Sequence, residues 1–424
     1  MNHYILTNAI VTDGFTFLHN NCDIEIKDNR IVKIGEGLAR NNIKCMDLGG
    51  RLVLPGLVNP HHHLYSALAT GIGPLGPINN FTQKLEQLWW PLDRSLNTES
   101  IYCSAMNGLI QSVRYGVTTI VDHHASMNAV NGSLDIIKKA YNEVGVKGLL
   151  CYEISDRMGE DALQEQIDEN IEFWNANKDN PNIKGLMGLH ANFTLSEKSM
   201  KKIAEQKPGE LPIHIHCAED GADKDYCQKL GYAGAVDRLN EFGLLSRESL
   251  LVHCIHLSEK DYALLDKIKP NVISNPESNA NNNVGMMDIN KIKKYVLGTD
   301  GMTGNVLGTM RSHFLQRHGN IKDPMNILLK NIADMMRGYF PDITQLQEGS
   351  LADLAVTNYR PVTGINLDNL FYHLMFGVQG KEMYMTISEG QIIFSDNTIH
   401  SVDEKQLNKE ISTAAKKLHE TYYA

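Results

Sequence analysis

Three consecutive histidines, His61, His62 and His63, follow the apolar run RLVLPGLVNP. Side chains two positions apart on a strand point to the same side, so His61 and His63 can converge on one metal ion. Imidazole nitrogen is a common ligand of zinc and of other divalent transition metals. The motif therefore predicts two metal ligands at the end of a strand, with His62 in a supporting or solvent-facing position.

A second histidine pair lies in the segment LPIHIHCAED. His214 and His216 again share one side of a predicted strand, and His216 lies nearer to its end. We therefore predict that His216 is a third metal ligand and that His214 is an interior residue. Glu219 follows on the loop and is predicted to shuttle protons, whereas Asp220 is predicted to be a solvated loop acid.

Two later apolar runs also end in residues that can bind or activate something. His253 ends the run SLLVH and is predicted to orient or activate the attacking water. Asp300 ends the run KYVLGTD, where a buried carboxylate is costly unless it has a partner. Asp300 is therefore predicted to complete the metal shell and to accept the proton of the water. Three imidazoles and one carboxylate suit a catalytic divalent ion that lowers the pKa of water toward neutrality.

The elements that must position these residues have the pattern of βα units. Between about Leu57 and Ser350, short apolar runs such as GVTTIVD and NVISN alternate with helix-like segments such as SMKKIAEQ. This alternation predicts a parallel sheet. Seven or eight such units fit a (β/α)8 TIM-like barrel, which needs about 250 residues. Barrel active sites lie at the carboxyl ends of the strands, and the polar residues described above are predicted to lie there.

Both ends of the chain have a β pattern instead. YILTNAIV and DIEIKDN near the start, and SLADLAVTN and MYMTISEGQIIFSD after Gly349, predict short strands separated by turns. We predict a small β-sandwich domain built from residues 1–56 and 351–424, with a terminal helix in the second part. Residues 57–350 are predicted to form the hydrolase barrel.

Composition narrows the class of protein. The net charge of −10 over 424 residues argues against a general nucleic-acid binder. The chain has no apolar run of eighteen residues and no secretory leader pattern, which predicts a cytoplasmic protein without a membrane span. Its expected partner is a small-molecule substrate. The aromatic segments LWWPL and LFYHLMF are compatible with a homodimer.

The motifs LPGLVNPHHH, HIHCAED and LGTDG, together with the strand of His253, resemble the amidohydrolase superfamily in its cytosine deaminase, chlorohydrolase and guanine deaminase branch. GLHANFT, SNPESN and EGSLADLAV extend the resemblance over nearly the whole chain. LEQLWWPLDRSL, TIVDHHAS and YEISDR are more closely similar to aminohydrolases of the SsnA type, which are associated with selenium-dependent purine or xanthine metabolism.

The resemblance implies a deaminase that releases ammonia from a small nitrogen heterocycle, such as a purine or a pyrimidine. Glu219 would protonate a ring or imine nitrogen, His253 would orient the attacking hydroxide, and His190 would line the substrate pocket. One divalent ion, zinc or alternatively iron, would be held by four residues: His61, His63, His216 and Asp300.

Further residues are predicted to contact the substrate. His123 follows the run TTIVD, and Arg157 follows YEISD and could bind a substrate oxygen or carboxylate through two hydrogen bonds. Trp89 could cap the pocket, with packing in the core or at an interface as the alternative. Where nucleoside-handling relatives place a ribose-binding Glu, this chain is predicted to have Leu92, which favours a free base or a compact heterocycle.

Three alternative functions share this fold. A two-metal hydrolase of cyclic amides would need a carboxylated lysine at a strand end, and Lys184 precedes its predicted strand instead. A chlorohydrolase would use all the same residues and release halide, so only product analysis separates it from a deaminase. A non-catalytic homologue acting as a scaffold would typically lose ligands that are all present here.

Overall fold

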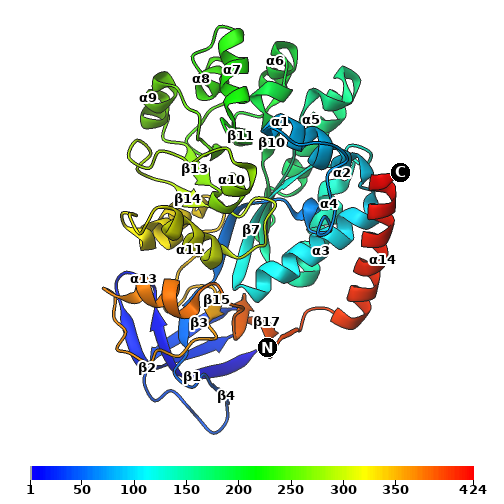
Figure 1. Cartoon of the computed structure of the whole chain (residues 1–424). Helices are drawn as coiled ribbons and strands as arrows, with labels where there is room; N and C mark the ends of the chain where they lie inside the picture. The colour runs from blue at the N-terminus through cyan, green and yellow to red at the C-terminus, as the bar shows by residue number, and fades with distance from the viewer. Residues whose placement is uncertain (1) are drawn as a thin grey trace.

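In the computed structural model, which describes residues 2–424, the middle of the chain forms a closed barrel of parallel strands (Figure 1). The fourth barrel strand is interrupted at Leu186 and therefore consists of two pieces. The barrel strands in chain order are β6 (Leu57–His62), β7 (Val117–His124), β8 (Lys147–Tyr152), β9 (Ile183–Gly185) with β10 (Met187–Ala191), β11 (Ile213–Cys217), β12 (Leu250–His253), β13 (Asn271–Ser274) and β14 (Val296–Leu297).

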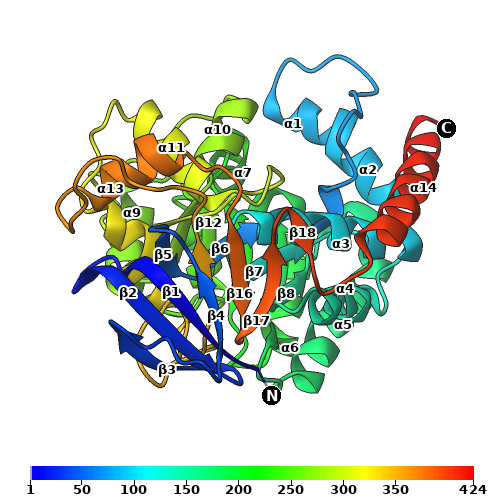
Figure 2. The ribbon, with the colours of Figure 1, turned by 90° about the horizontal axis from the view of Figure 1, so that it is seen from below.

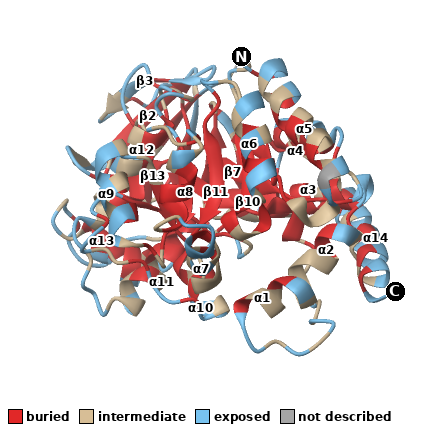
Figure 3. Ribbon diagram, turned by 90° about the horizontal axis from the view of Figure 1, so that it is seen from above, coloured by how far each residue is buried: buried red, intermediate tan, exposed pale blue. Residues whose placement is uncertain are grey.

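Two isolated bridges close the barrel. His62 pairs with Asp300 where the last strand meets the first, and Ile154 pairs with Leu189 between the third and fourth strands. The strands are rich in Val, Ile and Leu and are almost wholly buried, as expected for a parallel sheet that is covered on both faces (Figure 3). This arrangement confirms the predicted (β/α)8 barrel.

Helices follow the strands and cover the outside of the barrel. The longest of these covering helices, α3 (Thr98–Arg114), starts with a capping box, in which the side chains of Asn97 and Ser100 each bond to the backbone of the other residue. The ring consists of α3 (Thr98–Arg114), α4 (Ser133–Val144), α5 (Leu163–Ala176), α6 (Glu197–Gln206), α7 (Gly221–Lys229), α8 (Ala235–Glu241), α9 (Glu259–Ile268), α10 (Pro276–Asn282) and α11 (Val306–Gln316).

The loop after the first strand makes a long excursion before α3 begins. It contains α1 (Phe81–Lys84), a π-helical turn (Leu85–Trp89) and α2 (Trp90–Ser95). Phe81 and Leu85 pack with Val284 in a small apolar cluster, against which Trp89 also lies. The π-helical turn shifts the helix register locally, a feature that is frequent at functional sites.

The two ends of the chain build one β domain. β5 (Leu52–Pro55) pairs with β1 (His3–Thr12) on one side and with β15 (Leu354–Val356) on the other, so the two chain ends meet there. Leu6, Ile24 and Leu354 belong to a separate apolar core of this domain. The other strands are β2 (Leu18–Lys27), β3 (Arg30–Gly35), β4 (Lys44–Asp47), β16 (Met385–Ser388), β17 (Gln391–Ser395) and β18 (Thr398–Ile399). The predicted β-sandwich domain formed from both chain ends is confirmed (Figure 2).

The terminal helix α14 (Glu404–Tyr423) lies along α2 and α3 on the barrel side of the molecule (Figures 1 and 2). The Tyr422 hydroxyl is 3.1 Å from the carbonyl oxygens of Gly73 and Gln87, both in the long loop after the first strand. The helix therefore anchors that loop.

Other segments complete the barrel's surroundings. α12 (Asn331–Met336) packs under the amino ends of the barrel strands, and α13 (Leu370–Tyr372) lies near α11 (Figure 1). Among the described residues, no helix combines the length and the apolar character that crossing a bilayer requires.

Candidate active site

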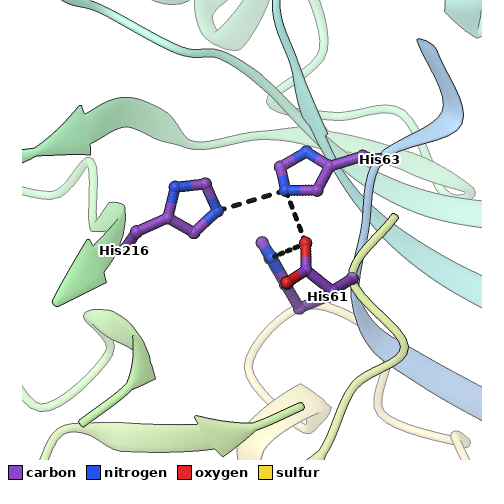
Figure 4. Close-up of side chains that lie close together, drawn as sticks. His61, His63 and His216 are labelled. Atoms are coloured by element: carbon purple, nitrogen blue, oxygen red, sulfur yellow. Dashed lines mark hydrogen bonds and ion pairs between the residues drawn. The ribbon is translucent and has the colours of Figure 1, made fainter. Parts of the chain in front are cut away.

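Four side chains converge at the carboxyl ends of the barrel strands, and Figure 4 shows three of them pointing toward one another. His63 Nε2 lies 3.0 Å from Asp300 Oδ1 and 3.1 Å from His216 Nε2, and His61 Nε2 lies 3.6 Å from Asp300 Oδ1. One ligand atom from each of the four residues lies within 4.8 Å of the other three. The structure thus brings together the metal ligands that the sequence predicts.

The donor set and its spacing fit a divalent ion such as zinc. Two ligands at the zinc distance of about 2.0–2.1 Å in a tetrahedron lie about 3.3 Å apart, close to the separations measured here. His61 Nε2 is also a buried nitrogen without a hydrogen-bond partner among the described residues. Burial would lower the pKa of His63, yet Asp300 and Glu153 raise it to about 9, so this cluster attracts positive charge.

Interior partners orient the two histidines of the first strand. His63 Nδ1 lies 2.6 Å from the carbonyl oxygen of His123 and therefore donates to it, which leaves the Nε2 lone pair for a metal. His61 Nδ1 lies 2.9 Å from His214 Nε2, and His214 Nδ1 lies 3.6 Å from the Cys151 sulfur. His214 is thus the interior residue that the sequence predicts, and it supports His61.

Backbone geometry and His62 together fix the position of Asp300. His62 is buried, and its Nδ1 donates to the carbonyl oxygen of Asp300 at 2.6 Å. Asp300 has φ 56° and His253 has φ 73°, left-handed values that cost roughly 1–3 kcal/mol each in residues other than glycine. Burial would raise the pKa of Asp300, but its close contacts with His61 and His63 hold it well below its usual range, so its carboxylate is ionised.

Glu219 and His253 form the acid–base side of the site. His253 Nε2 lies 3.4 Å from Glu219 Oε2 and 3.6 Å from Asp300 Oδ2. The other ring nitrogen, Nδ1, lies 2.8 Å from Asn279 Oδ1, and Asn282 Nδ2 donates to Glu219 Oε1 at 3.1 Å. Burial raises the pKa of Glu219 to about 7, a value suited to proton transfer near neutral pH.

A cavity of about 170 Å³ opens onto these groups. His190, Arg157 and Trp89 line it, in agreement with their predicted positions, and Phe81 and Leu85 add apolar wall. His123 instead lies beneath the ligand rings, with its ring centroid 4.7 Å from that of His216. The side chain of Glu277 on α10 accepts hydrogen bonds from Ser312 and Thr309 on α11.

Glu153 is a buried residue of the cavity wall that was not predicted from the sequence. It directly follows β8, and its carboxylate lies 2.9 Å from Arg157, 3.3 Å from His123 and 3.5 Å from His190. Burial would raise the pKa of Glu153, but these three neighbours hold it well below its usual range. The rule that flagged the other site residues, a polar side chain directly after a strand, applies to Glu153 as well.

Leu92 does not reach the cavity, so its apolar side chain says nothing about the substrate. It is buried in the main core, and the next residue, Asp93, lines the cavity instead. Asp93 Oδ2 accepts a hydrogen bond from Arg157 at 2.6 Å, and burial raises the pKa of Asp93 to about 6. An acidic group is therefore present on this wall.

Replacing Arg157 by methionine is expected to destabilise the fold by about 3–5 kcal/mol, because two buried carboxylates lose their cation. The side chains of Arg157, Asp93 and Glu153 are 7%, 2% and 3% exposed. Chemical denaturation measures the free energy of unfolding. The matched control is Lys417→Met, which removes an exposed pair with Glu99 and should cost less than about 1 kcal/mol. Equal losses in the two variants would contradict the assignment of a buried ionic wall.

Two comparisons of sequence place the chain among known proteins. A model of the amidohydrolase family matches residues 52–393. A 5-methylthioadenosine/S-adenosylhomocysteine deaminase of Pyrococcus furiosus is 26% identical over 419 residues, which cover 95% of this chain and 98% of that protein.

Two solved structures share the fold. The zinc-bound adenosine deaminase of Xanthomonas campestris has a TM-score of 0.84 at 17% identity, covering 98% of each chain. The zinc-complexed atrazine chlorohydrolase of Arthrobacter aurescens TC1 has a TM-score of 0.78 at 18% identity, covering 97% of this chain and 100% of its own.

Proposed function

The chain belongs to the amidohydrolase family, and from that premise we propose that it hydrolyses a carbon–nitrogen bond of a purine-type heterocycle and releases ammonia. One observation carries the proposal. The metal-binding group of His61, His63, His216 and Asp300 lies beside Glu219 and His253, and His63, His216, Asp300 and Glu219 line a cavity of about 170 Å³.

One divalent ion, zinc in preference to iron, is proposed for the site. Nitrogen and oxygen donors about 3.0–3.6 Å apart have separations compatible with tetrahedral zinc. A second ion next to Glu153 would have to displace the Arg157 guanidinium, which lies 2.9 Å from that carboxylate. Lys184, the candidate for a carboxylated bridging lysine, donates instead to the Lys178 carbonyl oxygen, away from the site. Both observations support one ion rather than two.

The proposed reaction divides proton transfer between two carboxyl groups. A divalent ion in the site would lower the pKa of water and so supply a nucleophile near neutral pH. Asp300, ionised, accepts the proton of the water as its oxygen attacks the sp² carbon that bears the amino group. Glu219, protonated, donates to the adjacent ring nitrogen, and His253 orients the water through its Nε2. The amino group then takes up a proton and leaves as ammonia, and the ring carbon keeps the oxygen.

The substrate class rests on the cavity and on the relatives. Phe81, Leu85 and Trp89 offer apolar surface for a planar ring, and the cavity volume of about 170 Å³ suits a compact ligand. The Pyrococcus furiosus relative is named for two adenosine-derived substrates, which supports an adenine-type amine. The closer resemblance to SsnA-type aminohydrolases also points to purines and stays a prediction. A cytoplasmic location and a homodimer are predictions of the same standing.

The test is an ammonia-release screen with zinc-loaded protein over matched pairs of free bases and nucleosides, together with metal analysis. Adenine, guanine and cytosine would be compared with adenosine and 5′-methylthioadenosine, and chlorinated analogues would be included. Ammonia from a purine with about one ion per chain supports the proposal. Halide release without ammonia would replace it with chlorohydrolysis, and two ions per chain would favour the cyclic-amide alternative.

A further inference from the structure

A second, larger cavity of about 690 Å³ lies at the opposite end of the barrel from the active site. Its wall includes the residues that begin or precede barrel strands, among them Pro212 before β11, Asn271 at the start of β13 and Val296 at the start of β14. Trp174 from α5 and Tyr339 beyond α12 form two other sides. The amino ends of barrel strands usually serve stability rather than catalysis, so a hollow of this size there needs an explanation.

Positive charge is concentrated in this cavity, although the whole chain carries a net charge of −10. Three carboxylates, those of Glu210, Glu248 and Asp334, face twice as many cations. The cations are Lys178, Lys184, Arg247, Lys269, Lys294 and Arg337. The cavity therefore has a local excess of positive charge, which attracts anions.

Two of these six cations have no partner among the described residues. Asp334 engages Lys294 at 2.9 Å and Arg337 at 3.2 Å. Among the residues that the structure describes, the side chains of Arg247 and Lys269 have no ion pair or hydrogen bond. Two cations therefore remain available to a ligand.

Two aromatic residues add contacts of a different kind. The Tyr339 hydroxyl is buried and has no hydrogen-bond partner among the described residues, which is costly unless something else supplies one. The Lys178 ammonium lies 3.7 Å from the centroid of the Trp174 ring. This cation–π contact holds the Lys178 charge at the cavity wall.

We propose that this cavity is a binding site for a phosphorylated small molecule that carries two or more negative charges. Its volume lies within the range of about 300–1,000 Å³ that is typical of small-molecule sites. Guanidinium and ammonium groups are the usual phosphate partners in proteins. The site is independent of the proposed deamination, since it shares no lining residue with the active-site cavity.

The test titrates the metal-loaded protein with inorganic pyrophosphate and with uridine diphosphate, which has no exocyclic amine to be hydrolysed. Calorimetry gives Kd, and tryptophan fluorescence reports the location because Trp174 lines this cavity. The site variant is Arg247→Glu with Lys269→Glu. The control is Lys33→Glu with Lys409→Glu, which makes the same charge change at exposed lysines elsewhere.

We expect saturable binding that weakens at least tenfold in the site variant and is unchanged in the control variant, with deaminase activity retained in both. The fluorescence change should disappear in Trp174→Phe. If the nucleotide binds more tightly than pyrophosphate, the site also binds the uridine moiety. If the two bind equally, the phosphates alone account for the affinity. The absence of saturable binding, equal weakening in both double variants, or binding that is lost in the metal-deficient His63→Ala protein would overturn the proposal.

Discussion

His63→Ala is expected to lose the metal and the ammonia-releasing activity together, with a rate lowered by at least about 10³-fold. His63 Nε2 lies 3.0 Å from Asp300 Oδ1 and 3.1 Å from His216 Nε2, between these two ligands. Its removal therefore takes the central donor out of the ligand set. An ion that stabilises developing charge contributes several kcal/mol to the transition state, and each 1.4 kcal/mol is a factor of ten in rate. Metal analysis and a steady-state ammonia assay measure the two losses.

The control for this change is His256→Ala, which removes a histidine outside the site. His256 Nε2 lies 2.8 Å from the carbonyl oxygen of Val284, away from the metal ligands. That variant should keep about one ion per chain and most of its activity. His63→Asn, with circular dichroism of all three variants, separates loss of metal from loss of fold. A folded His63→Ala protein that keeps both its ion and its activity would refute the ligand assignment.

The metal ligands were predictable because barrel geometry brings strand ends together whatever the loops between them do. His61 and His216 lie one residue before the ends of β6 and β11, and Asp300 lies three residues after the end of β14. The carboxyl ends of parallel strands meet at one rim of a barrel. A residue type that is costly to bury, placed at such a position, is then a candidate without any knowledge of tertiary contacts. The barrel and the β domain were predictable from the pattern of apolar residues. Apolar runs alternate with helix-like segments in the middle of the chain, whereas both ends have only short strand-like runs.

Residues that reach the site from helices were not predictable in this way. Asn279 and Asn282 lie on α10 and bond to His253 and Glu219, and their direction depends on how that helix packs. Leu92 illustrates a second cause. A π-helical turn precedes α2 and shifts the helix register, so a helical period applied to the sequence does not show that Asp93 faces the cavity.

Glu153 was missed for a different reason, because two of its three partners come from other strands. In the sequence it is one charged residue within YEISDR, and only Arg157 among its partners lies nearby in the chain. His123 and His190 come from β7 and β10, and the fold is needed to place them at 3.3 and 3.5 Å. The pairing of Arg157 with the buried carboxylates of Asp93 and Glu153 is therefore the part of the site that only the structure reveals.

Glu219→Gln is expected to lower the rate of ammonia release by about 10²–10⁴-fold while the metal stays bound. Glu219 lies outside the four-residue ligand group, and its carboxyl faces His253 Nε2 at 3.4 Å. Glutamine keeps the size of the side chain and can still bond to Asn282, but it cannot donate a proton to a ring nitrogen and take one back. The expected loss is that of general acid–base catalysis. Metal analysis alongside the assay separates this result from that of His63→Ala, where both quantities fall.

The pH dependence of the same variant tests the role of Glu219 more directly. Burial raises the pKa of Glu219 to about 7, so the protonated form persists up to neutral pH, and activity that needs this acid should fall as pH rises through about 7. Glutamine does not titrate, so this limb of the kcat/KM profile, which reports the free enzyme, should be absent from the variant. Asp220→Asn is the matched control, because Asp220 caps α7 through a hydrogen bond from the Ala222 backbone and asparagine can cap equally well. A variant with near-normal activity, or one that keeps the limb near pH 7, would assign the proton transfer to another group, with His253 the nearest candidate by position.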